Sequence, residues 1–158
     1  MSAANAQPAM ADTEHVSKAD STERYLTFCT DKLLFGVTTN YIIEIITNHV
    51  ITPVPMLPAY VKGIINLRGQ IVPIIDIRAR LRKPAIEYTG ASCVIVLNVD
   101  SVFIGIIVDS VDQVLNIDES RISPVPSGNR EELVSGMISV DGSGVVLILD
   151  CETLVSRS

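Results

Sequence analysis

The chain has 158 residues, 47% of them hydrophobic, and a formal net charge of −6 from 18 acidic and 12 basic residues. The length suffices for one ordinary domain or two very small ones with a shared core, and the negative charge argues against nucleic-acid binding, which needs a basic face. Aromatic residues make up only 4%, and the abundant Ile and Val, whose β-branched side chains fit a pleated sheet, indicate a β protein.

Residues 1–22 are rich in Ala, Ser, Thr and Asp without hydrophobic periodicity, which predicts a disordered tail. The segments 25–30 and 33–37 are β-branched or aromatic runs separated by Asp31-Lys32, a pattern that predicts a hairpin. The segment 38–46 is ambiguous between a short helix and a strand, because so short an apolar run has too little periodicity to decide.

The segment 49–58 contains three prolines, which predict an extended loop and argue against a central strand. Residues 61–81 follow as two apolar strands that turn at Arg68-Gly69 and lead into a short helix. Asp76 has the residue type and the place of an N-cap for this helix. We expect the segment 83–90 to be a linker.

The second half of the chain repeats the first. In each copy an apolar strand ends in an aspartate, Asp76 or Asp150, just before a short terminal helix. Repetition of this kind implies a duplicated β unit of about five strands, small enough to close into a barrel. With roughly 65 residues per unit, neither lobe would bury much alone, so we expect a core shared between them. The matching blocks are 26–36 with 95–105, 51–55 with 122–126, and 63–69 with 136–142.

The sequence offers no convergent set of catalytic groups. The two histidines, His15 and His49, fall in the predicted tail and in the proline-rich loop, without a Ser or Cys motif nearby. Asp76 and Asp150 occupy equivalent repeat positions, which favours helix capping over a catalytic carboxylate pair. We therefore predict a protein that is not an enzyme and that uses no metal and no cofactor.

The cysteines, Cys29, Cys93 and Cys151, form no CxxC or Cys/His pattern, so we expect buried free thiols in a reducing compartment. The N-terminus lacks the basic start and apolar core of a secretory signal. No apolar stretch approaches the roughly 18 residues that a membrane span needs. We expect a cytoplasmic protein that reaches a membrane only through a partner.

Two charged residues stand out because they are embedded in aliphatic sequence. Arg68 lies in GIINLRGQIVPIID, and the second copy has Asp141 at the same turn position, so the turn itself does not require a base. Arg68 is therefore available as a fork-like donor to a carboxylate. Glu44, inside TNYIIEIIT, suits the rim of a groove, and equally marks the solvent face of a strand. We interpret the basic cluster 78–83 as a solvated helix face.

These segments resemble the CheW family. The resemblance rests on the segment 63–76, on the upstream Glu44-Ile45 and on the segment 105–111, and it spans a domain over residues 23–155. It implies an all-β fold of two intertwined five-stranded SH3/OB-like barrels with short helices. Since strands of such a fold can be exchanged between lobes, the lobes need not correspond to the halves of the sequence.

The resemblance also implies a chemotaxis adaptor that couples transmembrane chemoreceptors to the histidine kinase CheA. Such a protein bridges the cytoplasmic tip of a receptor coiled coil and the regulatory domain of the kinase, and is recruited to receptor clusters at the inner membrane. The positions that match the family's receptor groove are Ile42, Glu44, Ile104, Gly105 and Val111, and those that match its region of partner coupling are Gly63 and Arg68.

Ile46 departs from the family pattern, which often has a basic residue there, and this puts a charged partner contact at that position in doubt. One alternative is the CheW-like end of a larger protein, but the upstream ATP-binding motifs or acidic phosphoacceptor domain that it needs do not fit in 158 residues. Another is a small β-barrel nucleic-acid-binding protein, against which the net charge and the lack of stacking aromatics argue.

Overall fold

The computed structural model describes residues 21–47, 50–81, 92–125, 133–142 and 144–156. The predicted linker at 83–90, both histidines and residues 1–20 of the predicted tail lie outside these ranges. The first strand begins at Thr22, one residue before the predicted start of the domain.

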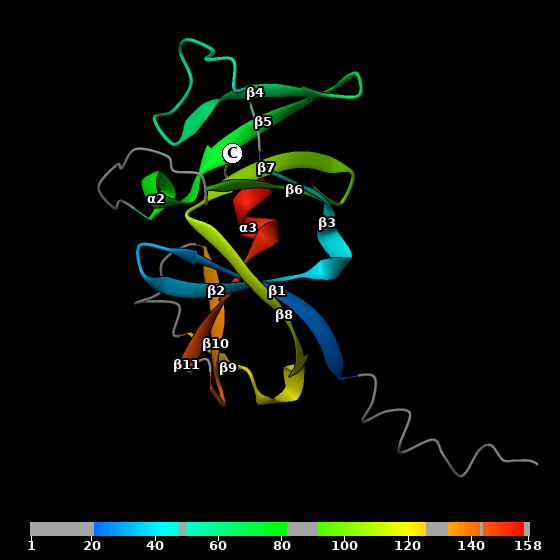
Figure 1. The fold of residues 1–158 in the computed structure, drawn as a ribbon, viewed down its shortest axis with the longest axis vertical. Helices are drawn as coiled ribbons and strands as arrows, with labels where there is room; N and C mark the ends of the chain where they lie inside the picture. Colours follow the sequence, from blue (N-terminus) through cyan, green and yellow to red (C-terminus); the bar gives the residue numbers. More distant parts are fainter. Residues whose placement is uncertain (1–20, 48–49, 82–91, 126–132, 143, 157–158) are drawn as a thin grey trace, which may run out of the picture.

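Strands dominate the described chain (Figure 1), and the predicted all-β fold class is confirmed. The segment 38–46, ambiguous in sequence, holds one turn of 3-10 helix followed by a strand. The strands are β1 (Thr22–Thr30), β2 (Leu33–Thr38), β3 (Ile42–Ile46), β4 (Val61–Leu67), β5 (Gln70–Asp76), β6 (Cys93–Val99), β7 (Val102–Val108), β8 (Ser110–Asp118), β9 (Ser123–Pro124), β10 (Val134–Val140) and β11 (Gly144–Leu149). The helices are α2 (Ile77–Arg80) and α3 (Cys151–Ser156), with 3-10 turns η1 (Thr39–Tyr41) and η2 (Glu119–Arg121).

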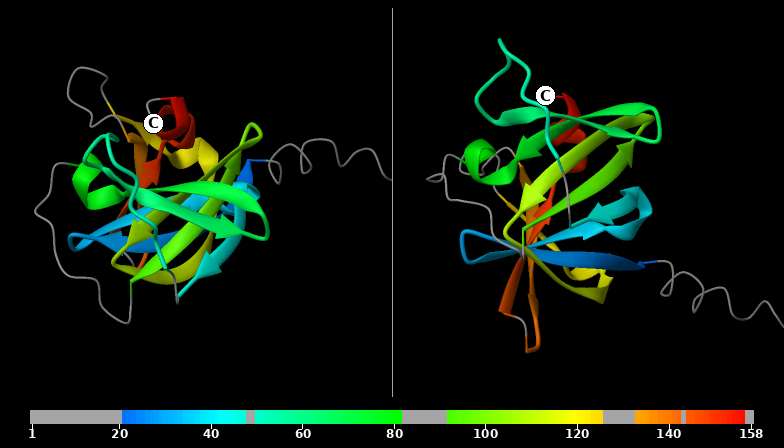
Figure 2. Two further views of the ribbon diagram at one scale, coloured as in Figure 1. Left: turned by 90° about the horizontal axis from the view of Figure 1, so that it is seen from above. Right: turned by 45° about the horizontal axis from the view of Figure 1, so that its top comes forward.

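The strands form two sheets, one ordered β8-β1-β2-β11-β10-β9 and the other β3-β6-β7-β5-β4 (Figure 2), which we call lobe 1 and lobe 2. By the repeat, β6, β7 and β8 correspond to β1, β2 and β3, while β10 and β11 correspond to β4 and β5. Each lobe therefore combines the first hairpin of one copy with the remaining strands of the other copy. The strand exchange that the family resemblance implied is present.

The pairing pattern repeats in detail between the lobes. Antiparallel pairing is interrupted by a register shift between Ile42 and Glu44 in one lobe and between Leu26 and Phe28 in the other. In both lobes a parallel pairing joins strands of different copies, β5 with β7 and β11 with β2. The duplication inferred from sequence is therefore visible in the backbone as well.

The expected shared core is the largest of three apolar clusters and draws residues from both sheets. Phe28 and Phe35 stack within it, with ring centroids 5.4 Å apart. Along β6, Ile95 faces the shared core and Val96 faces the smaller cluster inside lobe 2. A strand buried on both faces accounts for the unbroken apolar run of β6.

The helix caps follow the prediction. The Asp76 carboxylate accepts a hydrogen bond from the Arg78 N–H at 2.9 Å, at the start of α2. The Asp150 carboxylate accepts one from the Thr153 N–H at 3.1 Å, in the first turn of α3. The two aspartates are thus helix caps, as their equivalent repeat positions indicated.

An ionic network centred on the buried Arg78 joins the lobes where the chain crosses between them. Arg78, only 9% exposed, donates to the Asp109 carboxylate from Nη2 at 2.9 Å and from Nε at 3.2 Å. Its Nη1 donates to Asp31, in the β1–β2 turn, at 3.3 Å. Asp109 lies between β7 of lobe 2 and β8 of lobe 1. The interpretation of 78–83 as a solvated helix face is therefore wrong for Arg78, whose first-turn position directs it into this junction.

Removal of the Arg78 guanidinium should destabilise the fold. We expect Arg78→Met to lower the free energy of unfolding by on the order of 2–3 kcal/mol, because it leaves a partly buried carboxylate without its charged donor. Urea unfolding at neutral pH measures this effect. The matched control is Arg24→Met on the exposed side of β1, which should change stability by less than about 0.5 kcal/mol. Equal effects of the two substitutions would contradict this role of the network.

The same network predicts a pH dependence. Burial alone would raise the pKa of Asp109, but the hydrogen bonds from Arg78 and from the Asp31 N–H outweigh burial and hold this pKa below its usual value. A depressed folded-state pKa stabilises the fold above about pH 4, and the contribution is lost as the pH falls through that pKa. When the pH is lowered from about 6 to about 3, we expect the free energy of unfolding to fall less for the Asp109→Asn variant than for the parent chain. Parallel stability curves for the two proteins would show that Asp109 is not the titrating group.

Candidate partner-binding site

The predicted partner-binding residues lie mainly in lobe 2, at positions that differ widely in exposure. Ile42 and Glu44 lie on β3, Gly63 on β4, Arg68 in the β4–β5 turn, Ile104 and Gly105 on β7, and Val111 at the start of β8.

Arg68 and Glu44 form an ion pair, with 2.7 Å between Arg68 Nη2 and Glu44 Oε1. Because β3 and β4 are the opposite edge strands of the lobe 2 sheet, this contact connects one edge to the other and closes the lobe. The Arg68 side chain is 71% exposed, and an ion pair exposed to this degree contributes at most about 1 kcal/mol. The contact therefore orients the guanidinium more than it stabilises the fold.

The turn that carries Arg68 has the predicted position and a well-defined geometry. Arg68 and Gly69 have φ angles of 54° and 86°, the left-handed pair that a tight two-residue hairpin turn requires. Asn66 Oδ1 accepts a hydrogen bond from the Gly69 N–H at 2.8 Å and braces the turn. Asn66 therefore has a structural role here.

The most exposed apolar side chains of β3 are not the predicted ones. Ile43 and Ile45 are 45% and 39% exposed, whereas Ile42, Glu44 and Ile46 on the alternate positions are partly buried. Glu44 thus shares its side of the strand with partly buried isoleucines and faces Arg68. An edge strand that exposes branched apolar side chains is open to pairing or covering by another chain.

Ile42 and Val111 occupy equivalent positions in the two copies, at the start of β3 and near the start of β8. Ile42 lies opposite Leu97, and Val111 lies opposite Phe28, in the corresponding strand pairs. Both side chains are partly buried and pack against the shared core. The structure therefore places these two residues where that core reaches the surface of the molecule.

Gly63, Ile104 and Gly105 are buried, so none of them presents a side chain to a partner. Ile104 is 1% exposed and belongs to the shared core. A Cβ at Gly105 would lie 2.6 Å from Ile74 Cδ1, where β5 and β7 run parallel. Any effect of these three residues on binding therefore acts through the shape of the sheet.

Gly63 permits a close backbone crossing. Its φ is 149°, and a Cβ there would lie 2.2 Å from the carbonyl oxygen of Thr52 in the proline-rich loop. Thr52 and Ile64 exchange backbone hydrogen bonds of 2.9 Å beside it, which fastens the loop to β4. The glycine is thus required by the path of the loop.

Among the described residues, no group of three or more His, Cys, Asp or Glu side chains could hold a metal ion. No helix in this part of the chain is long and apolar enough to cross a membrane. Cys93 and Cys151 are buried free thiols as expected, whereas Cys29 is only partly buried. Burial, with nearby Asp150 and Glu152, raises the pKa of the Cys151 thiol to about 12, so this group does not serve as a nucleophile at neutral pH.

Comparison with known proteins settles the family. Residues 24–158 match the family model of the CheW-like domain. The chain belongs to the CheW family. CheW proteins are non-catalytic scaffolds of chemotaxis, which confirms the prediction that the chain is not an enzyme and leaves the nucleic-acid-binding alternative without support.

Relatives and a solved structure agree with this assignment. The chemotaxis protein CheW of Klebsiella aerogenes is 31% identical over 137 residues, which cover 85% of this chain and 82% of the relative. The CheW of Rhizobium meliloti is 38% identical over 100 residues, covering 61% of this chain and 64%, just under two thirds, of the relative. The scaffolding protein TtCheW from Thermoanaerobacter tengcongensis superimposes with a TM-score of 0.76 at 29% identity, covering 81% of this chain and 88% of that one.

The two equivalent glycines of the repeat should differ in their tolerance of a methyl group. We expect Gly63→Ala to lower the free energy of unfolding by about 3 kcal/mol, because it combines an unfavourable φ with a backbone clash. Gly136→Ala should cost less, about 1–2 kcal/mol, since the nearest atoms there are an Ile122 methyl at 2.6 Å and the Ser123 carbonyl oxygen at 3.0 Å, a milder clash than the one at Gly63. Chemical unfolding of both variants measures the difference, and a larger loss at Gly136 would contradict this account.

Proposed function

We propose that this CheW-family protein is an adaptor that couples transmembrane chemoreceptors to the histidine kinase CheA. The match of residues 24–158 to the CheW-like domain is the observation that carries the proposal. The exposed apolar edge of β3, beside an oriented arginine, supports it, because a scaffold without catalytic groups must act through such surfaces.

The receptor is proposed to bind along β3 and the adjoining margin of the shared core. The cytoplasmic tip of a receptor is a helical coiled coil, and an amphipathic helix can lay an apolar stripe on an aliphatic surface. Ile43 and Ile45 offer exposed branched side chains for that stripe, while Ile42 and Val111 mark the margin of the core. The buried Ile104 and Gly105 support this surface from beneath.

Arg68 is proposed to provide the polar part of the interface. A guanidinium has five N–H donors in a fixed fork, and one nitrogen of Arg68 is engaged by Glu44. The remaining donors of this largely exposed group can bind a partner carboxylate while Glu44 keeps the side chain in place. Gly63 contributes by fixing the loop that crosses the same hairpin.

The kinase is proposed to bind through its regulatory domain, so that receptor and kinase lie on one scaffold. A receptor signal then changes the relative populations of kinase-active and kinase-inactive arrangements. The protein itself would be cytoplasmic and would reach the inner membrane by recruitment to receptor clusters.

Co-sedimentation tests this function directly. The purified chain should pellet with receptor-containing membranes, and adding it to receptors and CheA should raise the rate of kinase autophosphorylation. Membranes without receptors are the control for nonspecific adsorption. Failure to bind several receptors, together with an unchanged kinase rate, would exclude the adaptor function.

The ion pair yields a charge-reversal prediction. Arg68→Glu and Glu44→Arg should each lower receptor-dependent kinase activation at least about fivefold, because like charges then meet at the hairpin. The double variant Arg68→Glu/Glu44→Arg restores an ion pair of opposite charges, and it should recover part of the receptor-dependent kinase activation. Thermal stability should change little in either single variant, since the pair is exposed.

The matched control for this series is Asp141→Arg, at the equivalent turn of lobe 1. It changes the net charge by two units, in the same direction as Glu44→Arg and opposite to Arg68→Glu, without touching β3 or the β4–β5 turn. Full activation by the Arg68→Glu variant, or an equal loss in the Asp141→Arg control, would remove the β4–β5 turn from the proposed interface.

A further inference from the structure

Among the residues that the structure describes, the β10 edge of lobe 1 is covered only in part. Strand β9 pairs with β10 at Gly136 and Met137, whereas β10 continues to Val140. In lobe 2 the equivalent hairpin is tied back to the opposite edge by the Arg68–Glu44 ion pair. The equivalent turn residue in lobe 1, Asp141, forms no ion pair with any residue that the structure describes. The two lobes are thus built alike but closed differently.

The backbone of this edge is oriented to accept another strand. The Val125 N–H donates to the Ser135 carbonyl at 3.3 Å, so this carbonyl faces the β9 side. The pairing of β10 with β11 shifts register between Val134 and Gly136, and beyond this shift Met137 lies opposite Ser123 of β9, as the next position whose main-chain groups face β9. Main-chain groups alternate between the two sides of a strand, so Ser139, two residues after Met137, directs its N–H and C=O to that same side. Ser139 lies beyond the last residue of β10 that β9 pairs with.

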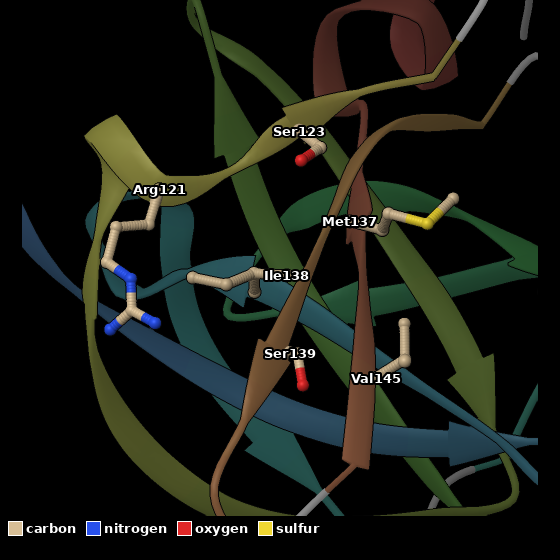
Figure 3. Close-up of a pocket in the computed structure, with 6 residues that line it drawn as sticks. All are labelled: Arg121, Ser123, Met137, Ile138, Ser139 and Val145. Carbon is tan, nitrogen blue, oxygen red and sulfur yellow. The ribbon is translucent and has the colours of Figure 1, made fainter.

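A pocket of about 330 Å³ surrounds this stretch of β10. Figure 3 shows the side chains of Met137 and Val145 on one side of the strand and those of Ile138 and Arg121 on the other. A second pocket of about 250 Å³ continues along the edge towards Asp141 and is bounded on its far side by β8. Two pockets therefore follow one another along this edge of β10.

The chemistry differs between the two sides. Met137 and Val145, 38% and 53% exposed, provide an apolar surface. Arg121 provides a cation that forms no ion pair within the described chain. The nearby Asp118 carboxylate already accepts hydrogen bonds from the hydroxyls of Ser21 and Ser120, at 2.9 and 2.6 Å. Arg121 attracts the Asp118 carboxylate electrostatically but forms no ion pair with it, so an acidic group from another chain could pair with this guanidinium directly.

We propose that the free edge of β10 binds an extended segment of a partner protein by strand addition, with an acidic side chain facing Arg121 and the neighbouring apolar side chain packing on Met137 and Val145. Adjacent residues of a strand point to opposite sides, which fits the division between the charged and the apolar side of this edge. The surface lies in lobe 1 and needs neither Arg68 nor Glu44, so the proposal goes beyond the coupling of receptor and kinase.

A short peptide tests the proposal on the full chain. The probe is the acetylated and amidated pentapeptide Thr-Val-Glu-Val-Thr, and its counterpart carries Lys in place of Glu. In ¹⁵N-labelled protein, the glutamate peptide should shift the amide resonances of Ser139 and its neighbours and of Arg121. It should bind at least about fivefold more tightly than the lysine peptide, since the central charge meets Arg121.

Two substitutions separate the backbone contribution from the charge. Ser139→Pro removes the outward N–H and should abolish binding, while Ser139→Ala keeps the N–H and should bind normally. A proline is tolerated on an edge strand where its nitrogen faces outward, and thermal unfolding verifies that the variant is folded. Arg121→Glu should reverse the preference between the two peptides, which tests the proposal even if the proline variant does not fold.

Three outcomes would overturn the proposal. Equal binding of both peptides would exclude the role of Arg121, and unchanged binding by folded Ser139→Pro would exclude strand addition. Self-association that depends on the same residues, detected by sedimentation of the peptide-free protein, would assign the edge to a second copy of this chain instead. Neither receptor nor kinase is present, so failure here leaves the proposed coupling function untouched.

Discussion

The exchange of hairpins between the two copies of the repeat is the constraint on which the rest of the structure depends. The β1–β2 hairpin completes a sheet made otherwise of second-copy strands, and β6–β7 completes the sheet of the first copy. The lobes cannot separate without breaking both sheets and opening the apolar cluster between them. Because each copy is too small to bury much surface alone, this mutual completion is what allows two small lobes to form one stable body.

Strand exchange also decides which residues reach the surface. Strands β6 and β7 become central and are buried on both faces, which places Ile104 and Gly105 inside the protein. Among the strands at the margins, β3 in lobe 2 and β9 with its neighbour β10 in lobe 1 carry the exposed apolar side chains and incomplete pairing that other chains can use. Both proposed binding surfaces are therefore consequences of where the sheets end.

Local signals in the sequence sufficed for much of the fold. The turns at Asp31 and Arg68 and the cap at Asp76 depend on neighbouring residues, so the sequence predicted them. The duplication was predicted because the two halves of the sequence match each other block by block. The ion pairs of Arg68 with Glu44 and of Arg78 with Asp109 depend on strand order, which periodicity does not reveal. The burial of Ile104 and Gly105 did have a signal, since an unbroken apolar run is typical of a strand covered on both faces.

The internal duplication separates residues that the fold requires from residues that are free to serve binding. Where the backbone makes the same demand in both lobes, the residue type recurs. Gly63 and Gly136 both lie where the backbone of another segment passes close to the strand. Asp76 and Asp150 each cap the helix that ends their copy of the repeat. The turn that carries Arg68 in one copy has Asp141 in the other, so the hairpin itself does not require a particular charge there. The charge at this turn therefore reflects what each hairpin contacts, which in lobe 2 is Glu44 on the opposite edge strand.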